Sequence, residues 1–338
     1  NTTGNYNVAV GANTLDANTT GQLNVAIGYN ALTAQNADGY NTSVGAQSME
    51  STTTGNYNVA VGRLALNQNT TGSENVAIGY GALDAQTTAS YNTAVGYQAL
   101  TSSTTAIVST AIGWGALSSN TTGAQNTAVG ANCMQNNTTG GSNVALGRQS
   151  MQANTTGNNN TALGYTALIS NTTADNNTAV GYRALFANTT GTTNTAVGSD
   201  ALYANTTGIN NTALGTGAGK TQTTLHGCTW VGTDAGRVNI ASNNTGVGAG
   251  ALYSNTTGTQ NTAVGTGIYG STQGALGSNT TGDHNTAVGS RSLVLNTTGS
   301  SNTAVGDRAL QANTTQSNNT AVGYRALISN STADQNTA

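Results

Sequence analysis

Hydrophobic and polar residues follow one short sequence pattern that is repeated along this chain with a constant period. A glycine follows a Val, Ile or Leu at positions 11, 28 and 45, and the spacing of 17 holds as far as position 232. The series then continues at 248, 265, 289, 306 and 323, so that one step is shortened to 16 and another is lengthened to 24. A period held through nineteen such anchor glycines indicates a repeat protein, because every copy must occupy an equivalent place in the structure.

Each position of the repeat, which we call a column when the copies are aligned on the anchor glycine, also keeps the same type of residue. The residue before each anchor glycine is branched aliphatic, as in Val10 and Ile27, and the residue before that is almost always Ala. Ala and then Leu or Met come three and four residues after the glycine, and an Asn-Thr-Thr-Gly cluster typical of a turn follows. Short β-branched pieces bounded by Gly predict strands, because a helix needs apolar residues at i, i+3, i+4 and i+7.

Identical pieces stacked in register predict parallel ladders, with Val on Val, Leu on Leu and Asn on Asn. The dipeptide Asn-Gly, a strong signal for a two-residue hairpin, does not occur in the sequence. We therefore predict an all-β fold, a parallel β-solenoid or β-roll with one coil per 17 residues and about 20 coils.

One such coil cannot be stable alone. Its two large aliphatic side chains, from the Val and Leu columns, are too few to offset the entropy of ordering the whole coil. Even in a stack, a core of Ala, Val and Leu is thin, so we expect neighbouring chains to complete it, as in a homotrimer. On this interpretation residues 1–338 form a single continuous repeat shaft with irregular coils at 216–247 and an insertion at 266–277. The sequence begins and ends within a copy of the repeat, and we therefore expect it to be a fragment of a longer chain.

Composition and charge limit the classes of structure and partner that we expect for this chain. Charged residues make up 6% of the chain, the net charge is -3 and Pro is absent, which favours an ordered polar repeat over a disordered one. Eight basic residues are too few for a phosphate-binding surface, so we expect no nucleic-acid partner. No uninterrupted apolar run approaches the roughly 18 residues of a membrane helix, so we expect no membrane insertion.

Several pieces of the repeat match the motifs of known fibres. NVAIG (residues 24–28), STAIG (109–113) and NTAVG (126–130) resemble the strand motif of trimeric autotransporter adhesin heads. The longer stretch NTTGNNNTALGYTAL (154–168) resembles repeats of phage tail-fibre-like proteins. The resemblance covers essentially the whole chain and implies a parallel β-roll that assembles as a trimer, although the period is longer than is usual in adhesin heads.

One stretch suggests nucleotide chemistry. Residues 215–221 read GTGAGKT, but a phosphate-binding P-loop needs Gly where this chain has Leu214, and no strand-then-helix unit surrounds the stretch. We interpret it as a loosened coil, because the Leu column also fails at Gly219 and Gly236.

The remaining reactive residues point to no active site. His226 and Cys228 lie beside Trp230, but two ligands do not make a zinc site. Cys133 falls in the Ala column, which indicates a small buried residue. The acidic residues are scattered singly, without the close carboxylate pair of a glycosidase. We therefore expect no catalytic, cofactor-binding or metal-ligating residues, no cofactor and no enzyme activity.

Two surface features remain open. The column just after the anchor glycine holds Tyr, Trp and Arg, so we expect it to face outward. An aromatic row there either contacts sugars or, as we favour, shields the sheet. The Asn-Thr-Thr clusters are glycosylation sequons, but turn and ladder formation is the simpler reason for them.

The leading functional hypothesis is a structural shaft of an extracellular or virion fibre, of the tail-fibre or adhesin type, that displays a binding tip. We expect it to be located outside the cell, at the cell surface or on a virion, with its own copies as the main partner and a cell-surface glycan or receptor as a second. The alternatives are a β-solenoid that binds carbohydrate or ice directly, and a self-assembling extracellular filament or matrix protein.

Overall fold

The computed structural model describes residues 3–37, 39–267 and 273–338, and within these ranges it contains strands and turns but no helix. The chain divides into two compact units, unit 1 (Asn1–Thr173) and unit 2 (Ala174–Ala338). Each unit is a stack of coils with one parallel strand per coil. The prediction of an all-β parallel solenoid is therefore confirmed.

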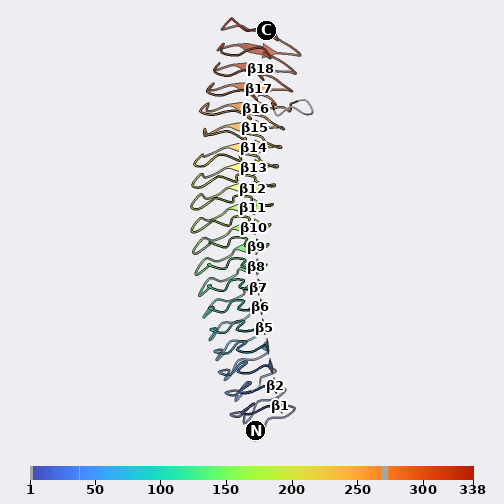
Figure 1. Ribbon diagram of the computed structural model, residues 1–338, viewed down its shortest axis with the longest axis vertical. Coiled ribbons are helices and arrows are strands. Elements are labelled where there is room, and N and C mark those ends of the chain that lie inside the picture. The colour runs from blue at the N-terminus through green and yellow to red at the C-terminus, as the bar shows by residue number, and fades with distance from the viewer. Residues whose placement is uncertain (1–2, 38, 268–272) are drawn as a thin grey trace. The chain divides into compact units, whose positions relative to one another are not determined.

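In unit 1 the strands stack in chain order, as Figure 1 shows. Val8, Ala9 and Val10 lie beside Val25, Ala26 and Ile27, a shift of one full repeat. Each described strand is three residues long. The strands described in unit 1 are β1 (Val8–Val10), β2 (Val25–Ile27), β3 (Thr42–Val44), β4 (Val59–Val61), β5 (Val76–Ile78), β6 (Thr93–Val95), β7 (Thr110–Ile112), β8 (Thr127–Val129), β9 (Val144–Leu146) and β10 (Thr161–Leu163).

Unit 2 repeats this arrangement. Its described strands are β11 (Thr178–Val180), β12 (Thr195–Val197), β13 (Thr212–Leu214), β14 (Thr229–Val231), β15 (Thr245–Val247), β16 (Thr262–Val264), β17 (Thr286–Val288), β18 (Thr303–Val305) and β19 (Thr320–Val322). Both irregular steps of the sequence lie in this unit and leave the pairing intact. Thr229 pairs with Thr245 across the deletion, and Thr262 pairs with Thr286 across the insertion.

The insertion at 266–277 is bonded to the preceding coil on both of its described sides. Its residues 268–272 lie outside the described residues. After them the backbone N–H of Gly274 donates to the carbonyl of Gly250 at 2.9 Å, and Ala275 and Leu276 are fully buried. These two residues supply the Ala and Leu columns of their coil, so the core is not interrupted.

The core differs from the prediction in one respect. Leu32 and Ala26 are 0% exposed, as expected, but Ile27 and Val61 of the Val column are 38% and 37% exposed. Side chains alternate along a strand, and here the central Ala faces inward, so the residues on either side of it face outward. Within one chain, the prediction that the Val column belongs to the core is therefore wrong.

Buried Asn side chains take the place that Val leaves in the core. In the column four residues before the anchor glycine, the backbone N–H of Asn75 donates to Oδ1 of Asn58 in the preceding coil at 3.0 Å. The Nδ2 group of Asn75 donates to the carbonyl of Ala89 at 3.1 Å. All three of these residues are at most 3% exposed. The expected stacking of Asn on Asn is thus confirmed, and the amides are paired as buried polar groups must be.

A second Asn column lies seven residues after the anchor glycine. Nδ2 of Asn137 donates to Oδ1 of Asn120 at 2.8 Å and to the carbonyl of Gly140 in its own turn at 2.9 Å. A typical coil therefore contains two hydrogen-bonded amides inside the stack. These amides lie in the core of the coil together with the Ala and Leu columns.

The anchor glycine is required by both its conformation and its surroundings. Gly96 has φ of +139°, and a Cβ there would lie 2.5 Å from the carbonyl oxygen of Gly113 in the next coil. The Leu column also adopts positive φ, +51° at Leu32 and +50° at Leu100, which costs about 1–2 kcal/mol per residue. Such strain persists because the stacked coils on both sides hold the backbone in place.

We predict that Gly96→Ala lowers the free energy of unfolding by at least about 2 kcal/mol, because Ala is strained at this φ and overlaps the next coil. Chemical denaturation followed by circular dichroism measures the change. Gly81→Asn is the matched control, since Gly81 has φ of +60° and a Cβ added there would lie 3.7 Å from its nearest neighbour. Equal destabilisation by the two variants would contradict the argument.

Candidate functional surfaces

The described residues contain no pocket and no group of three or more His, Cys, Asp or Glu side chains that could hold a metal ion. The same part of the chain contains no helix long and apolar enough to cross a membrane. The side chains that the sequence singles out lie either in the core of the coils or on their outer surface.

The P-loop-like stretch at 215–221 forms an ordinary coil. Strand β13 is followed by a turn, and the backbone N–H of Gly215 donates to the carbonyl of Val197 at 2.8 Å, as the register requires. The amine of Lys220 donates to Oδ2 of Asp200 at 2.9 Å. The interpretation of a loosened coil is wrong, because the coil keeps both its register and a filled core.

Trp230 fills the core at the place where the Leu column fails. It occupies a position of the inward Ala column, in the middle of β14, and is 0% exposed. A Cβ on Gly219 would lie 2.7 Å from the indole ring, and one on Gly236 would lie 2.3 Å from it. The indole therefore occupies the volume that Leu side chains fill in other coils.

Two further residues are adapted to this indole. Gln222 stands where most coils have Asn, and its Oε1 accepts a hydrogen bond from Nε1 of Trp230 at 2.8 Å. Gly246 replaces the inward Ala of the next strand, and a Cβ there would lie 2.9 Å from the ring. In the irregular coils of unit 2, the large side chain of Trp230 is thus compensated by smaller or matching residues around it.

The other reactive residues near Trp230 lie in different environments. His226 is exposed, and its Nδ1 accepts the backbone N–H of Ile209 at 3.1 Å. Cys228 is buried, and its thiol donates to the carbonyl of Ala241 at 3.5 Å. Burial raises the pKa of this thiol. The pair does not converge on a common ligand position.

Cys133 lies in the inward Ala column, as the sequence predicts. It is 0% exposed, and its thiol donates to the carbonyl of Ala145 at 3.3 Å. Burial raises its pKa to about 12, so the thiol is protonated and unreactive at neutral pH.

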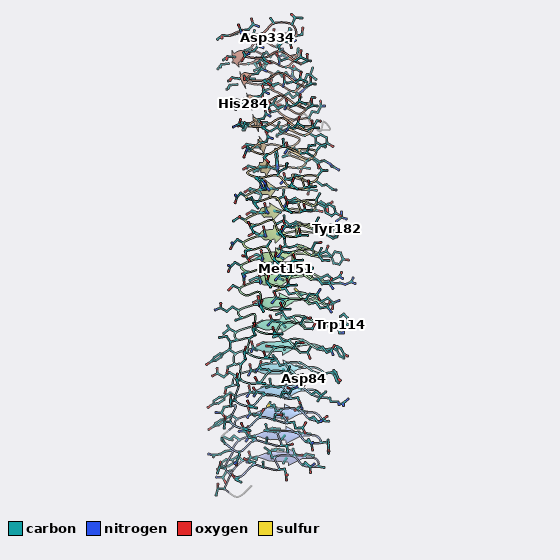
Figure 2. All side chains as sticks on the ribbon, turned by 90° about the vertical axis from the view of Figure 1, so that its left-hand side faces the viewer. Asp84, Trp114, Met151, Tyr182, His284 and Asp334 are labelled. Carbon is teal, nitrogen blue, oxygen red and sulfur yellow. The ribbon has the colours of Figure 1, made fainter. Side chains whose placement is uncertain are left out.

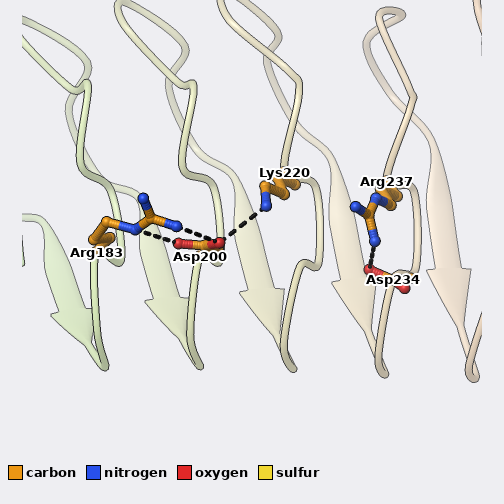
Figure 3. A network of polar contacts seen from close by, with 5 residues as sticks. All are labelled: Arg183, Asp200, Lys220, Asp234 and Arg237. Atoms are coloured by element: carbon orange, nitrogen blue, oxygen red, sulfur yellow. Dashed lines mark hydrogen bonds and ion pairs between the residues drawn. The ribbon is translucent and has the colours of Figure 1, made fainter.

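The densest group of charged side chains described lies on unit 2 (Figure 3). Asp200 accepts Nε and Nη2 of Arg183 at 2.8 and 2.9 Å, and it also accepts Nζ of Lys220 at 2.9 Å. The Arg183 guanidinium lies 4.7 Å from the ring centroid of Tyr182 and 4.9 Å from that of Tyr203. A neighbouring pair joins Arg237 to Asp234 at 2.8 Å. The two carboxylates offset two of the three positive charges, and the contacts around Asp200 tie successive coils together.

The Asp200 carboxyl titrates at a lower pH than an isolated one. Burial by itself would raise its pKa, but hydrogen bonds from Lys220 and Arg183 and their positive charges outweigh the burial, so the pKa is lowered. A group whose pKa is lower in the folded state stabilises the fold above its unfolded pKa. That stability is lost as the pH falls through the folded value.

The column after the anchor glycine faces outward, as predicted. Trp114 in unit 1 and Tyr182 in unit 2 are 54% and 47% exposed, and both project from the surface in Figure 2. Tyr80 and Tyr97 stack with ring centroids 5.3 Å apart and an interplanar angle of 13°. Because stacked rings cover each other's faces, this geometry favours shielding of the sheet over sugar binding.

The Asn-Thr-Thr sequons are built into the core. The sequon residues Asn69, Asn120 and Asn188 are all 0% exposed. The hydroxyl of the following Thr is also used in the stack, since Thr70 donates to the carbonyl of Thr87 at 3.0 Å. Glycosylation of these Asn side chains is therefore incompatible with the folded coils.

A surface that the sequence pattern did not single out is the outer side of the strands. We call it the strand face, formed by the first and third residues of each strand. In unit 1 the first residue is Val or Thr, and in unit 2 it is Thr in all nine described strands. The alternation Thr-Ala-Val indicates this face, because the first and third residues of a strand point to the same side. Hydrophobicity alone assigns the Val column to the core.

No protein-family model and no curated protein matches this sequence.

We predict that Trp230→Ala lowers the free energy of unfolding by about 3–5 kcal/mol, because no Leu is available to fill the space that the indole leaves. Adding Gly219→Leu and Gly236→Leu to this variant restores the usual columns and should recover most of the loss. Chemical denaturation measures both changes. Failure of the two Leu residues to rescue Trp230→Ala would show that the indole does not replace them.

We predict that Asp200→Asn destabilises the chain near neutral pH and that the difference from wild type shrinks in acid, as the pH falls through the lowered folded pKa of the Asp200 carboxyl. Asn tolerates the positive φ of this position, +57°, so the backbone is preserved. Thermal unfolding across this range of pH measures the effect. Asp234→Asn, which removes a single ion pair, should change stability less; a pH-independent difference for Asp200→Asn would contradict the prediction.

Proposed function

We propose that this chain is a structural shaft of an extracellular or virion fibre, which displays a binding tip and has no catalytic role. The observation that carries the proposal is the continuity of the stack within each unit. Backbone hydrogen bonds and a filled core pass through the deletion, the insertion and the Trp230 coil without a break. Such continuity is what a rigid spacer needs, and the resemblance to adhesin heads and tail fibres agrees with it.

The proposal includes self-association through the strand face of unit 1, with a second copy of this chain as the occupant. The face carries exposed aliphatic side chains, among them Ile27 (38%), Ile112 (40%) and Leu146 (50%). Tyr29 and Tyr57 lie in the columns that flank it and are 56% and 57% exposed. A row of exposed apolar side chains of this kind is typical of an interaction surface.

The regularity of the face favours a copy of the same chain as its partner. Its apolar side chains recur once per coil in unit 1, so a partner that covers the whole row must carry side chains at the same interval. Another copy of the same repeat meets this requirement. Closed symmetry then limits the number of copies, and a homotrimer is the state that the resemblance implies.

We predict a mass of three chains for the wild-type protein in sedimentation equilibrium. The double variant Val61→Lys with Ile78→Lys places two charges on the strand face of unit 1 and should reduce the mass to that of one chain. Thr71→Lys with Thr88→Lys is the matched control, because these exposed turn residues lie in the same two coils. A wild-type mass of one chain over the accessible concentration range would reject self-association.

A further inference from the structure

We infer that the strand face of unit 2 binds ice, with the outermost water layer of the crystal as its ligand. The inference goes beyond the proposed shaft, since it assigns a ligand to a surface of the repeat itself. It begins with the uniformity of the face. The first residue is Thr in every described strand of unit 2, and the third is Val or Leu. The Thr residues are Thr178, Thr195, Thr212, Thr229, Thr245, Thr262, Thr286, Thr303 and Thr320.

The two rows form a regular lattice. Parallel strands lie about 4.8 Å apart, and alternate residues of one strand lie about 6.7 Å apart. Both intervals are close to oxygen–oxygen repeats in the planes of hexagonal ice. The pairings Thr229 with Thr245 and Thr262 with Thr286 show that the irregular coils of unit 2 do not displace the rows. A periodic solid is the ligand that a periodic surface of this size fits.

The Thr hydroxyls of the strand face are available to a ligand. Among the described residues, the side chains of Thr195, Thr212 and Thr245 make no hydrogen bond within the protein. The turn Thr residues differ, since the hydroxyl of Thr206 donates to the carbonyl of Thr223 at 3.1 Å. Hydroxyls on the strand face can therefore bond water, while the methyl groups of Thr and Val between them hold water in cages.

The two rows carry no charged side chain. The ion pairs of unit 2 involve residues outside these rows, such as Arg183 and Asp200. Charged groups would hold strongly oriented hydration shells that do not match a crystal. The column just after the anchor glycine is mixed in unit 2, since it adds hydroxyls at Ser199, Thr216 and Thr233 but also holds Tyr182 and Asp307. The strand face of unit 1 lacks these properties, because Val interrupts its Thr row at positions such as Val59 and Val144.

The test is partition of the purified full chain into slowly growing ice, together with the shape of ice crystals grown in its presence. Wild type should be enriched in the ice fraction and should facet the crystals. Thr212→Lys with Thr229→Lys, the third and fourth residues of the row, should lose both effects. The matched control is Thr207→Lys with Thr224→Lys, which adds the same charges at exposed turn positions and should behave as wild type.

A milder variant keeps the test decisive if the Lys variant does not fold, as judged by circular dichroism. Thr212→Val with Thr229→Val removes the hydroxyls at constant shape and should reduce the fraction partitioned. Exclusion of the wild type from ice overturns the inference, as does equal partition of the strand-face and control variants. The mass measurement separates this result from the proposed function. A trimer excluded from ice retains self-association and loses the ice-binding face, and a single chain that partitions into ice retains the ice-binding face and loses self-association.

Discussion

Each coil of this protein depends on hydrogen bonds from the adjacent coils of its unit. Backbone N–H groups, Asn amides and turn Thr hydroxyls all find partners one coil away, as in Asn75 with Asn58 and Thr70 with Thr87. A coil removed from the stack would leave these groups unpaired, with too little apolar surface to compensate. Stability in such a repeat lies in the interfaces between copies and is small within each copy.

This dependence explains why some columns of the repeat hold one residue type while others accept many. The anchor glycine, the inward Ala and the two Asn columns each meet their own kind in the neighbouring coil at close range. The position after the anchor glycine faces outward, and it accepts Tyr, Trp, Arg, Asp and Ala alike. The residue types are therefore uniform where coils contact each other and variable where they face outward. As a result, the chemistry of the surface can change without disturbing the stack.

The spacing of the glycines was enough to predict the period, the parallel register and the stacking of Asn on Asn. The inside and outside of the strand were not predicted correctly, because hydrophobicity alone would bury Val in preference to Ala. Geometry reverses that order: a three-residue strand centred on Ala must turn Val outward, and Asn amides fill the interior. The role of Trp230 also escaped prediction, since its indole fits against Gly219 and Gly236, which meet it only in the folded stack.

The placement of the two tryptophans has an optical consequence. Unit 1 contains Trp114, which is 54% exposed, and unit 2 contains Trp230, which is fully buried. An indole in water emits at longer wavelength than one in an apolar core, so the fluorescence of the native chain is the sum of a red component from unit 1 and a blue component from unit 2. Each unit thus carries one tryptophan as an intrinsic fluorophore, and loss of order in unit 2 alone would shift the emission to longer wavelength.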